Sequence, residues 1–538
     1  MIQISNIKLK VPHTEEALKE KALKQLHIRP QELLSMQIMK RSLDARRKPE
    51  LYYVYTILLS VKNESRLKKK KLSGNVKFCD PPVPYKIVPT GTENMVHPPV
   101  VVGSGPAGLF CAYSLAKMGY DPILIERGED VDTRMQDVNG FWNGKALLPN
   151  SNVQFGEGGA GTFSDGKLNT LVHDKEGRGR AVLETFVKFG APEKILYDNK
   201  PHVGTDILSV VVKRMRQEII RMGGSVHFHT QMTELMTDKN KLTGIKTVDT
   251  HTKEETCIPC EALVLAIGHS ARDTFEMLKE KNVPMNAKSF AVGVRVEHPQ
   301  AMINENQYGI ANPKGLSAAP YKLTANLENG RGVYTFCMCP GGYVVNASSE
   351  AGRLAVNGMS YSGRDGVNAN SAVIVTVTPE DYGSDDVLAG MQFQRKLEQA
   401  AYEAGKGNIP VQLFKDFCNN TPSVSGGKIK PQMKGAFEWA NIRPIFPEEI
   451  AASLEEGIKS FDSKIKGYAD DETLLSGVES RTSSPVRILR DETLQSSLKG
   501  LYPCGEGAGY AGGITSAAMD GLKSAEAISA YYRPAGMR

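Results

Sequence analysis

Residues 100–108 constrain the fold of this chain more than any other stretch. Three valines at 100–102 run into Gly-Ser-Gly-Pro-Ala-Gly at 103–108, and an apolar helical pattern follows to Met118. A strand, a Gly-x-Gly-x-x-Gly turn and a helix in this order are typical of a dinucleotide-binding unit. The second glycine lets a pyrophosphate approach the backbone, and the N–H groups at the helix start favour an anion. We therefore predict that this turn binds a dinucleotide.

The next predicted strand, residues 122–126, supports that interpretation. It ends in Glu126, close to the distance of about 20 residues at which a carboxylate binds the ribose hydroxyls of a dinucleotide. The alternative is a glycine-rich turn with a purely structural role. The strand before the turn, the helix after it and Glu126 together favour dinucleotide binding.

Composition describes an ordinary globular protein. The length of 538 residues indicates more than one domain, since domains hold roughly 100–200 residues. Hydrophobic residues make up 41% of the chain, and no long apolar run predicts a membrane span. The N-terminus lacks the form of a signal peptide, and eight dispersed cysteines do not indicate a disulfide scaffold. We expect a cytoplasmic protein with reduced thiols.

Residues 1–86 carry the basic charge of the chain. They hold 19 Lys and Arg against 8 Asp and Glu, a net charge of +11, so the remainder of a +6 chain carries −5. Strand patterns at 2–10 and 51–61 and a helical pattern at 14–26 predict a small α+β domain. Its basic runs at 46–48 and 68–71 are candidates for binding RNA or another polyanion. A solvated surface that opposes aggregation is the alternative.

Two further glycine-rich stretches predict close approach of the backbone to a ligand. Residues 156–166 hold five glycines, which excludes an ordinary helix or strand, and a mobile loop is the alternative. Ser164 and Asp165 before an apolar pattern predict the start of a helix. Residues 500–514 run from a strand into glycines and then into a helical pattern at 515–530. The start of that helix could face an anion or a polar ring edge.

Two cysteine pairs and one polar run are ambiguous. Cys257 and Cys260 form a CxxC inside a strand pattern without a second pair, which favours incidental thiols over a metal or redox site. Cys337 and Cys339 would point the same way on a strand, either as a buried pair or beside a substrate. For residues 479–487, a salt-bridged loop and a substrate contact are both open. No metal site is predicted.

Together these motifs resemble the glutathione-reductase-like FAD-dependent oxidoreductases. The resemblance is specific to the bacterial family described only as uncharacterised FAD-dependent dehydrogenases, and it extends over nearly the whole chain. It rests on the turn at 103–108 with Glu126 and on five further runs. These are GEGGAGTFSDGKL at 156–168, AIGHSARD at 266–273, FCMCPGG at 336–342, ESRTSSPVR at 479–487 and CGEGAGYAGGI at 504–514.

The resemblance implies an α/β fold with a Rossmann-like FAD-binding domain assembled from discontinuous segments, an inserted α+β substrate domain and a small basic α+β N-terminal domain. The expected divisions are an N-terminal domain at 1–86, a Pro-rich linker at 87–98, the first part of the FAD domain at 99–284, the substrate or cap domain at 285–475 and the last part of the FAD domain at 476–538.

The resemblance also implies which residues bind FAD. The pyrophosphate would lie on the 103–107 turn and near Ala266 and Gly268, the adenosine at Glu126 and Met232, and the flavin ring beside the 158–162 segment and the helix after Gly513. The full expected set is Gly103, Ser104, Gly105, Ala107, Gly108, Glu126, Arg127, Gly158, Gly159, Ala160, Gly161, Thr162, Met232, Ala266, Gly268, Gly505, Glu506, Gly513 and Ile514.

One departure from the reductase pattern concerns the electron donor. No second strand-Gly-x-Gly-x-x-Gly-helix unit follows the first, so NAD(P)H would be a transient donor, or the substrate itself would deliver the electrons. The candidate catalytic residues are Arg481 as an anion or carbonyl clamp, Cys337 and Cys339 near the flavin ring, and His202 as acid or base.

Three functions are compatible with the residues. The first is an oxidoreductase that transfers hydride through flavin N5 to or from a small molecule. The second is a flavin-dependent reductase of RNA bases, with residues 1–86 binding the RNA. The third is a flavin-bound sensor without turnover. The substrate, the direction of hydride transfer and the oligomeric state are not predicted.

Overall fold

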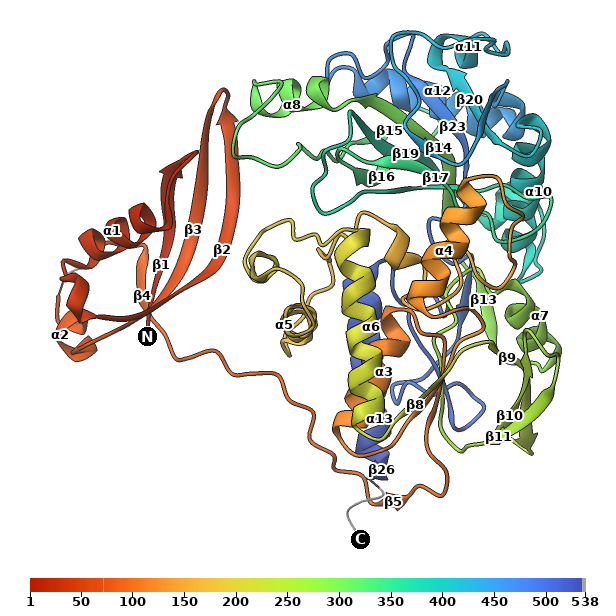
Figure 1. Cartoon of the computed structure of the whole chain (residues 1–538), viewed down its shortest axis with the longest axis horizontal. Coiled ribbons are helices and arrows are strands. Elements are labelled where there is room, and N and C mark those ends of the chain that lie inside the picture. Colours follow the sequence, from red (N-terminus) through yellow and green to blue (C-terminus); the bar gives the residue numbers. More distant parts are fainter. Residues whose placement is uncertain (71, 535–538) are drawn as a thin grey trace.

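The computed structural model describes residues 1–70 and 72–534 (Figure 1). Lys71, the last residue of the second basic run, lies outside the described residues. The chain is a mixed α/β protein with three parts. These are an N-terminal domain, a domain built on a parallel sheet, here called the parallel-sheet domain, and a domain inserted into it, here called the cap domain.

The parallel-sheet domain contains five strands in the order β25-β12-β6-β7-β8, all parallel. Their short Val, Ile and Leu runs are nearly all buried, as expected for a sheet covered on both faces. The strands are β6 (Val100–Val102), β7 (Ile123–Ile125), β8 (Ser225–His227), β12 (Leu263–Leu265) and β25 (Leu501–Pro503).

Helices cover one face of this sheet and a smaller sheet covers the other. The helices α3 (Pro106–Lys117), α6 (Thr205–Arg221) and α13 (Ile514–Tyr531) lie side by side on the first face (Figure 1). An antiparallel sheet and α7 (Arg272–Glu280) pack on the second. That sheet consists of β9 (Thr230–Asp238), β10 (Lys241–Asp249) and β11 (Glu255–Pro259). Also in this domain are α4 (Val131–Trp142), η2 (Ala160–Phe163), α5 (Arg178–Lys188) and η3 (Glu193–Leu196).

The cap domain is organised around a seven-stranded sheet of order β15-β16-β19-β14-β23-β20-β22. Its strands are β14 (Phe290–Pro299), β15 (Thr324–Asn326), β16 (Gly332–Cys339), β19 (Asn368–Val377), β20 (Ile409–Leu413), β22 (Phe437–Trp439) and β23 (Leu474–Glu479). The expected boundary at 475 therefore falls inside β23.

Helices and a second sheet complete the cap domain. The helices are α8 (Gln300–Tyr308), α9 (Pro379–Tyr382), α10 (Ala389–Ala404), α11 (Phe414–Cys418), η4 (Arg443–Ile445) and α12 (Glu448–Phe461). The small sheet has the order β18-β17-β21, with β17 (Tyr343–Asn346), β18 (Val356–Met359) and β21 (Met433–Lys434). The chain crosses between the two domains in an antiparallel ribbon of β13 (Met285–Ala287) and β24 (Val486–Ile488).

The N-terminal domain is a four-stranded antiparallel sheet of order β2-β3-β1-β4, a split β-α-β arrangement. The Thr14 hydroxyl accepts a hydrogen bond from Ala17 N at 3.3 Å and begins the predicted helix. The elements are β1 (Ile2–Lys10), α1 (Glu15–Leu26), η1 (Pro30–Glu32), β2 (Leu33–Arg47), β3 (Glu50–Val61), α2 (Glu64–Lys68) and β4 (Val76–Phe78).

Specific contacts hold the N-terminal domain and its linker against the rest. Arg41 on β2 donates two hydrogen bonds to the Asp198 carboxylate, at 2.6 and 2.9 Å, and its backbone N donates to Tyr197 O at 2.7 Å. The linker includes β5 (Glu93–Asn94), which pairs with β26 (Tyr532–Arg533). The Pro-rich segment therefore lies along the parallel-sheet domain (Figure 1).

One local prediction is corrected by the structure. Ser164 and Asp165 do not begin a helix, because the buried Asp165 carboxylate binds Arg364 and Lys167 instead. The glycine-rich segment forms the 3₁₀ turn η2 just before them.

Among the described residues, the helices are all too short or too polar to cross a membrane.

Candidate functional site

A cavity of about 460 Å³ lies at the carboxyl ends of the parallel strands, below the cap domain. Segments that follow β6, β7, β12 and β25 form one side, and β16 of the cap domain contributes Thr335 to Met338 to the other. Ligands bind in open parallel sheets at this edge, outside the carboxyl ends of the strands. The cavity is therefore the candidate functional site.

The glycines of the 103–108 turn differ in what surrounds them. A Cβ on Gly108 would lie 1.8 Å from Gly103 O, so this glycine permits α3 to pack against the turn. A Cβ on Gly105 would meet only the Gly159 Cα, at 3.9 Å, and would otherwise project into the cavity. The space above Gly105, at the N-terminus of α3, is open to a ligand.

Glu126 is held at the end of β7 by four hydrogen bonds. Its Oε2 accepts from Ser104 N at 2.9 Å and from Ser104 Oγ at 2.7 Å. Its Oε1 accepts from Gly128 N at 3.0 Å and from Gly156 N at 3.2 Å. The carboxylate is thus fixed between the 103–108 turn and the second glycine-rich segment, at the cavity wall.

His269 and Glu506 line the cavity from the segments that follow the neighbouring strands β12 and β25. His269 Nδ1 lies 3.2 Å from Glu506 Oε1, and His269 Nε2 is buried without a hydrogen-bond partner among residues 1–70 and 72–534. Glu506 is among the residues expected to bind FAD, whereas His269 is not. The run AIGHSARD at 266–273 contains His269 and is the feature of the sequence that points to it.

The structure brings most of the expected FAD-binding residues to the cavity wall. Those that line it are Gly103, Gly105, Ala107, Glu126, Arg127, Gly159, Ala160, Gly161, Met232, Ala266, Gly268, Glu506, Gly513 and Ile514. The expected residues Ser104, Gly108, Gly158, Thr162 and Gly505 lie behind this wall. A Cβ on Gly158 would lie 2.0 Å from Thr162 Oγ1, so these two residues pack against each other.

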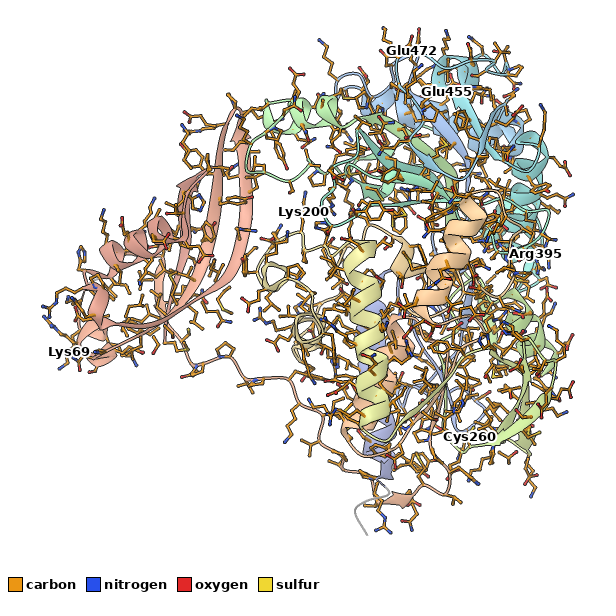
Figure 2. All side chains as sticks on the ribbon, in the orientation of Figure 1. Lys69, Lys200, Cys260, Arg395, Glu455 and Glu472 are labelled. Carbon is orange, nitrogen blue, oxygen red and sulfur yellow. The ribbon has the colours of Figure 1, made fainter. Side chains whose placement is uncertain are left out.

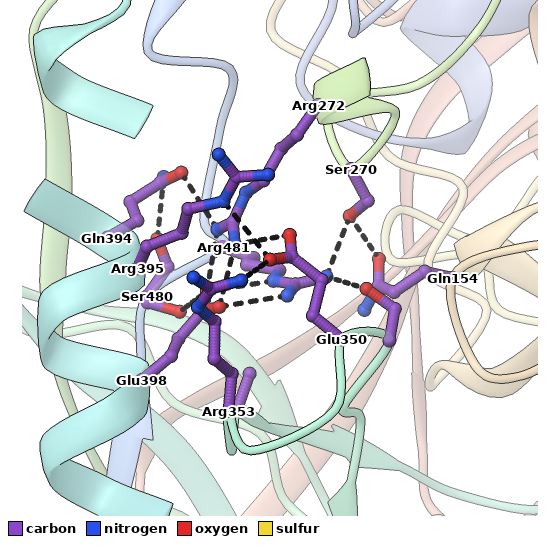
Figure 3. Close-up of polar contacts among 12 residues, drawn as sticks. Gln154, Ser270, Arg272, Glu350, Arg353, Gln394, Arg395, Glu398, Ser480 and Arg481 are labelled. Carbon is purple, nitrogen blue, oxygen red and sulfur yellow. Dashed lines mark hydrogen bonds and ion pairs between the residues drawn. The ribbon is translucent and has the colours of Figure 1, made fainter. Parts of the chain in front are cut away.

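Arg481 lines the cavity, but its guanidinium is bound by the protein. Nε and Nη2 each donate to the Glu398 carboxylate at 2.9 Å, and Nη1 donates to Ser349 Oγ at 2.5 Å (Figure 3). Glu398 on α10 also accepts two hydrogen bonds from Arg272, each 2.8 Å long. These contacts occupy both edges of the Arg481 guanidinium. Few of its N–H groups are therefore left to bind a substrate in a bidentate manner.

Opposing effects set the protonation of Glu398. Its burial raises the pKa, but the charges and hydrogen bonds of Arg272 and Arg481 outweigh burial and hold the pKa well below its usual range. Glu398 is 0% exposed and therefore remains an anion between two cations. The ion pairs of Glu398 with Arg272 and Arg481 agree with the interpretation of residues 479–487 as a salt-bridged loop.

Cys337 and Cys339 do not point the same way, contrary to the strand pattern. A bulge lies between Phe336 and Cys339, and Cys337 has φ 43°, in the left-handed region. Cys337 is exposed in the cavity, whereas Cys339 is buried with its Sγ 3.8 Å from Arg295 Nη1. The protein that surrounds the cavity shields the Cys337 thiol from bulk water, and this desolvation raises the pKa of Cys337 to about 12.

His202 lies outside this cavity. It lines a second cavity, between the N-terminal domain and the rest of the chain. Burial, with the charge of Arg364, lowers the pKa of His202 to about 4, so the ring is neutral at pH 7. His202 and Cys337 are therefore not brought together at one site.

The two basic runs of the N-terminal domain are separated. Arg46 binds Asp44, and Lys48 donates to Asn306 O on the cap domain, so these residues of the first run make contacts within the protein. Lys69 of the second run lies at the far end of the domain (Figure 2). The first run therefore lies beside the cap domain, and Lys69 lies away from it.

One group of possible metal ligands was not found from the sequence. Glu129, His229 and His251 bring their donor atoms within 4.8 Å of one another. Glu129 Oε1 lies 3.3 Å from His229 Nδ1 and 3.1 Å from His251 Nε2. The three residues come from separate turns, so no spacing in the sequence signals them.

Comparisons with known proteins identify the family. The model of the pyridine nucleotide-disulphide oxidoreductases matches residues 97–274, that of the "FAD-dependent protein, C-terminal domain-like" family matches 289–482, and a domain of unknown function matches 1–60. An uncharacterised protein of Clostridium beijerinckii is 48% identical over 532 residues, 98% of each chain. This chain belongs to the FAD-dependent pyridine nucleotide-disulphide oxidoreductase family.

Solved structures resemble this FAD-dependent oxidoreductase only distantly. A glycerol-3-phosphate dehydrogenase from Bacillus halodurans, in complex with FAD, is 12% identical with a TM-score of 0.36, and the match covers 81% of this chain and 64% of that one. A glycine oxidase from Bacillus cereus is 12% identical with a TM-score of 0.30, covering 80% and 94%.

FAD is the cofactor, and the cavity has features that fit it. The open space above Gly105 at the start of α3 suits a pyrophosphate, and Glu126 presents a fixed carboxylate to a ribose. His269 Nε2 is an unsatisfied buried ring nitrogen at the same wall. At the other end, Gly513 and Ile514 place the N-terminus of α13 against the cavity, where it can stabilise negative charge on a ring edge.

Proposed function

We propose that this FAD-dependent oxidoreductase transfers hydride between its flavin and a small molecule that binds below the cap domain. One observation carries the proposal. The same cavity is walled by the dinucleotide-binding turn on one side and by Cys337 of the cap domain on the other, so a substrate that contacts the cap domain would lie next to the cofactor. The order of the glycine-rich runs supports the glutathione-reductase-like arrangement.

Bound FAD supplies the capacity to accept or give up hydride. The residues of the chain would hold and isolate it. The 103–108 turn and Glu126 would bind its pyrophosphate and ribose, and the N-terminus of α13 would stabilise negative charge on the ring. The buried pair of Arg272 on α7 and Glu398 on α10 fixes the cap domain over the cavity. The cap domain thereby keeps bulk water from the reacting atoms.

Cys337 is the side chain of the cap domain best placed to touch the substrate. It projects into the cavity from a bulge whose backbone is held by Arg295, which donates from Nη1 to Cys337 O at 2.9 Å. With a pKa of about 12, the Cys337 thiol is protonated at neutral pH and acts as a weak hydrogen-bond donor or proton source rather than as a nucleophile.

An anaerobic titration tests the proposal. The purified protein is followed at the oxidised-flavin absorbance band while NADH or NADPH is added, and then while a panel of metabolites is added. We expect one donor class to bleach the band and a matching acceptor to restore it. A flavin that none of the donors reduces, and that stays reduced in the presence of every acceptor after photoreduction, would favour the sensor function instead.

A further inference from the structure

A second cavity, of about 600 Å³, lies where the N-terminal domain meets the rest of the chain. His13, Arg41 and Tyr53 contribute to its wall from the N-terminal domain. His202 and Tyr308 contribute from the other side. The ion pair of Arg41 with Asp198 is part of this wall, so the contact that fixes the N-terminal domain also shapes the cavity.

The two cavities meet. Lys200, Pro320 and Arg364 line both of them, so the FAD cavity and the interdomain cavity share a junction. Figure 2 shows Lys200 on the side of the molecule that faces the N-terminal domain. A molecule in the interdomain cavity would reach the cap-domain end of the FAD cavity through this junction.

The junction carries excess positive charge. Arg364 Nε donates to Asp165 Oδ1 at 3.0 Å, and Lys167 Nζ lies 3.1 Å from Asp165 Oδ2, so one buried carboxylate is shared by two cations. Lys200 adds a third cation. Lys200 is exposed to the cavities, and desolvation by the surrounding protein together with the charges of Arg364 and Lys167 lowers its pKa.

A buried polar atom at the junction lacks a partner. His202 Nε2 has no hydrogen-bond partner among the residues that the structure describes, and the buried Lys167 Nζ forms no hydrogen bond there beyond its ion pair with Asp165. Such atoms are rare in folded proteins, because a buried polar group without a partner loses its hydrogen bonds to water and gains none in return. Arg364 is also held at φ 50°, a backbone conformation that a non-glycine residue seldom adopts. These features favour a ligand that pairs with the donors.

We propose that Lys200, Lys167 and Arg364 form an anion site that binds a carboxylate or phosphate group of the substrate. The inference rests on the proposed function, because it places the anionic group at the mouth of the cavity that FAD shares with the substrate. It names the substrate class as a small anionic molecule. It also gives the N-terminal domain a role, since that domain walls the route by which such a molecule arrives.

Calorimetric titration of the FAD-loaded protein with inorganic phosphate and, separately, with malonate tests this site. We expect one of the two anions to bind and uncharged malonamide not to bind. Lys200→Gln should lower the affinity for the anion about tenfold or more, because one charge-assisted contact is lost. Lys200→Arg should retain most of the affinity. Lys69→Gln, which removes the same charge at the far end of the N-terminal domain, is the matched control.

The results of these titrations show which anion the site binds, or that the site does not exist. Binding of phosphate alone or of malonate alone identifies the group that the site prefers. Equal affinity in Lys200→Gln and wild type, or no binding of either anion at millimolar concentrations, overturns the site. Flavin absorbance of the same samples reports FAD loading, and the titration is repeated on FAD-free protein. Anion binding through Lys200 in a protein whose flavin no donor reduces and no acceptor reoxidises would contradict the proposed function but not the anion site.

Discussion

Glu398 and Arg481 are joined by two hydrogen bonds of 2.9 Å each at the boundary between the cap domain and the parallel-sheet domain. Arg272 from α7 donates two more to the same carboxylate (Figure 3). One buried anion therefore compensates two buried cations that come from both sides of the boundary. Removing it leaves both cations uncompensated.

Glu398→Gln is expected to destabilise the protein by about 3–5 kcal/mol, because breaking a buried ion pair leaves a desolvated charge without its partner. Scanning calorimetry should show a lower melting temperature. Glu403→Gln, on the exposed side of the same helix α10, is the control and should melt like wild type. Unchanged melting of Glu398→Gln would show that solvent reaches Arg272 and Arg481.

Gly105 and Gly108 should respond in opposite ways to alanine. In Gly105→Ala the added methyl enters the cavity, so we expect FAD to bind at least about tenfold more weakly while the FAD-free protein melts normally. In Gly108→Ala the methyl meets Gly103 O, so we expect lower stability even without FAD, by about 1–3 kcal/mol. FAD titration by absorbance and thermal melting distinguish the two, and equal loss of stability would contradict the prediction.

The buried carboxyl group of Glu297 should make the stability of the folded protein depend on pH. It is fully buried on β14, which raises its pKa to about 7, and its Oε1 has no hydrogen-bond partner among the described residues. Because the folded pKa exceeds the unfolded value of 4.5, its contribution to stability is fully present below pH 4.5 and is lost as the pH rises to about 7. The loss is on the order of 3 kcal/mol.

Glu297→Gln should therefore be more stable than wild type at pH 8, and this advantage should shrink toward pH 5. Melting temperatures measured across that range test the sign. Glu305→Gln, at an exposed position of α8, should show no such trend. If the melting temperature of Glu297→Gln exceeded that of wild type by more at acid pH, Glu297 would be ionised in the folded protein.

Cys337 should react slowly despite its exposure in the cavity. With a pKa of about 12 it holds little thiolate at pH 8, so iodoacetamide should modify Cys257, exposed on β11, well before Cys337. Peptide mass spectrometry gives both rates in one sample. FAD loading should slow the reaction at Cys337 further and leave Cys257 unaffected. Faster reaction at Cys337 would reveal an activated thiolate.

The features predicted well from the sequence are those that depend on neighbours in the chain. The strand, turn and helix at 100–118 form within one short segment, and Gly103 and Gly108 meet because they belong to the same turn. The helix α1 follows from the Thr14 cap for the same reason. These segments can be assigned to an α/β fold without knowing which distant residues contact them.

The features that could not be predicted depend on partners far away in the sequence. Arg481 is an attractive anion clamp until α10 brings Glu398, 83 residues earlier, against it. Asp165 resembles a helix cap until Arg364, 199 residues later, binds it. Cys337 departs from strand alternation because of a bulge opposite β19, which is visible only once the two strands pair.

The ribbon of β13 and β24 has a consequence for how the chain is assembled. Met285 lies opposite Ile488 and Ala287 opposite Val486, so about two hundred residues leave and rejoin the parallel-sheet domain at a single place. The parallel sheet is completed by β25 whatever lies beyond the ribbon. The ribbon is therefore the point at which one cap could be joined in place of another from the family, and the new cap would have to supply a carboxylate for Arg272 and a cation for Asp165.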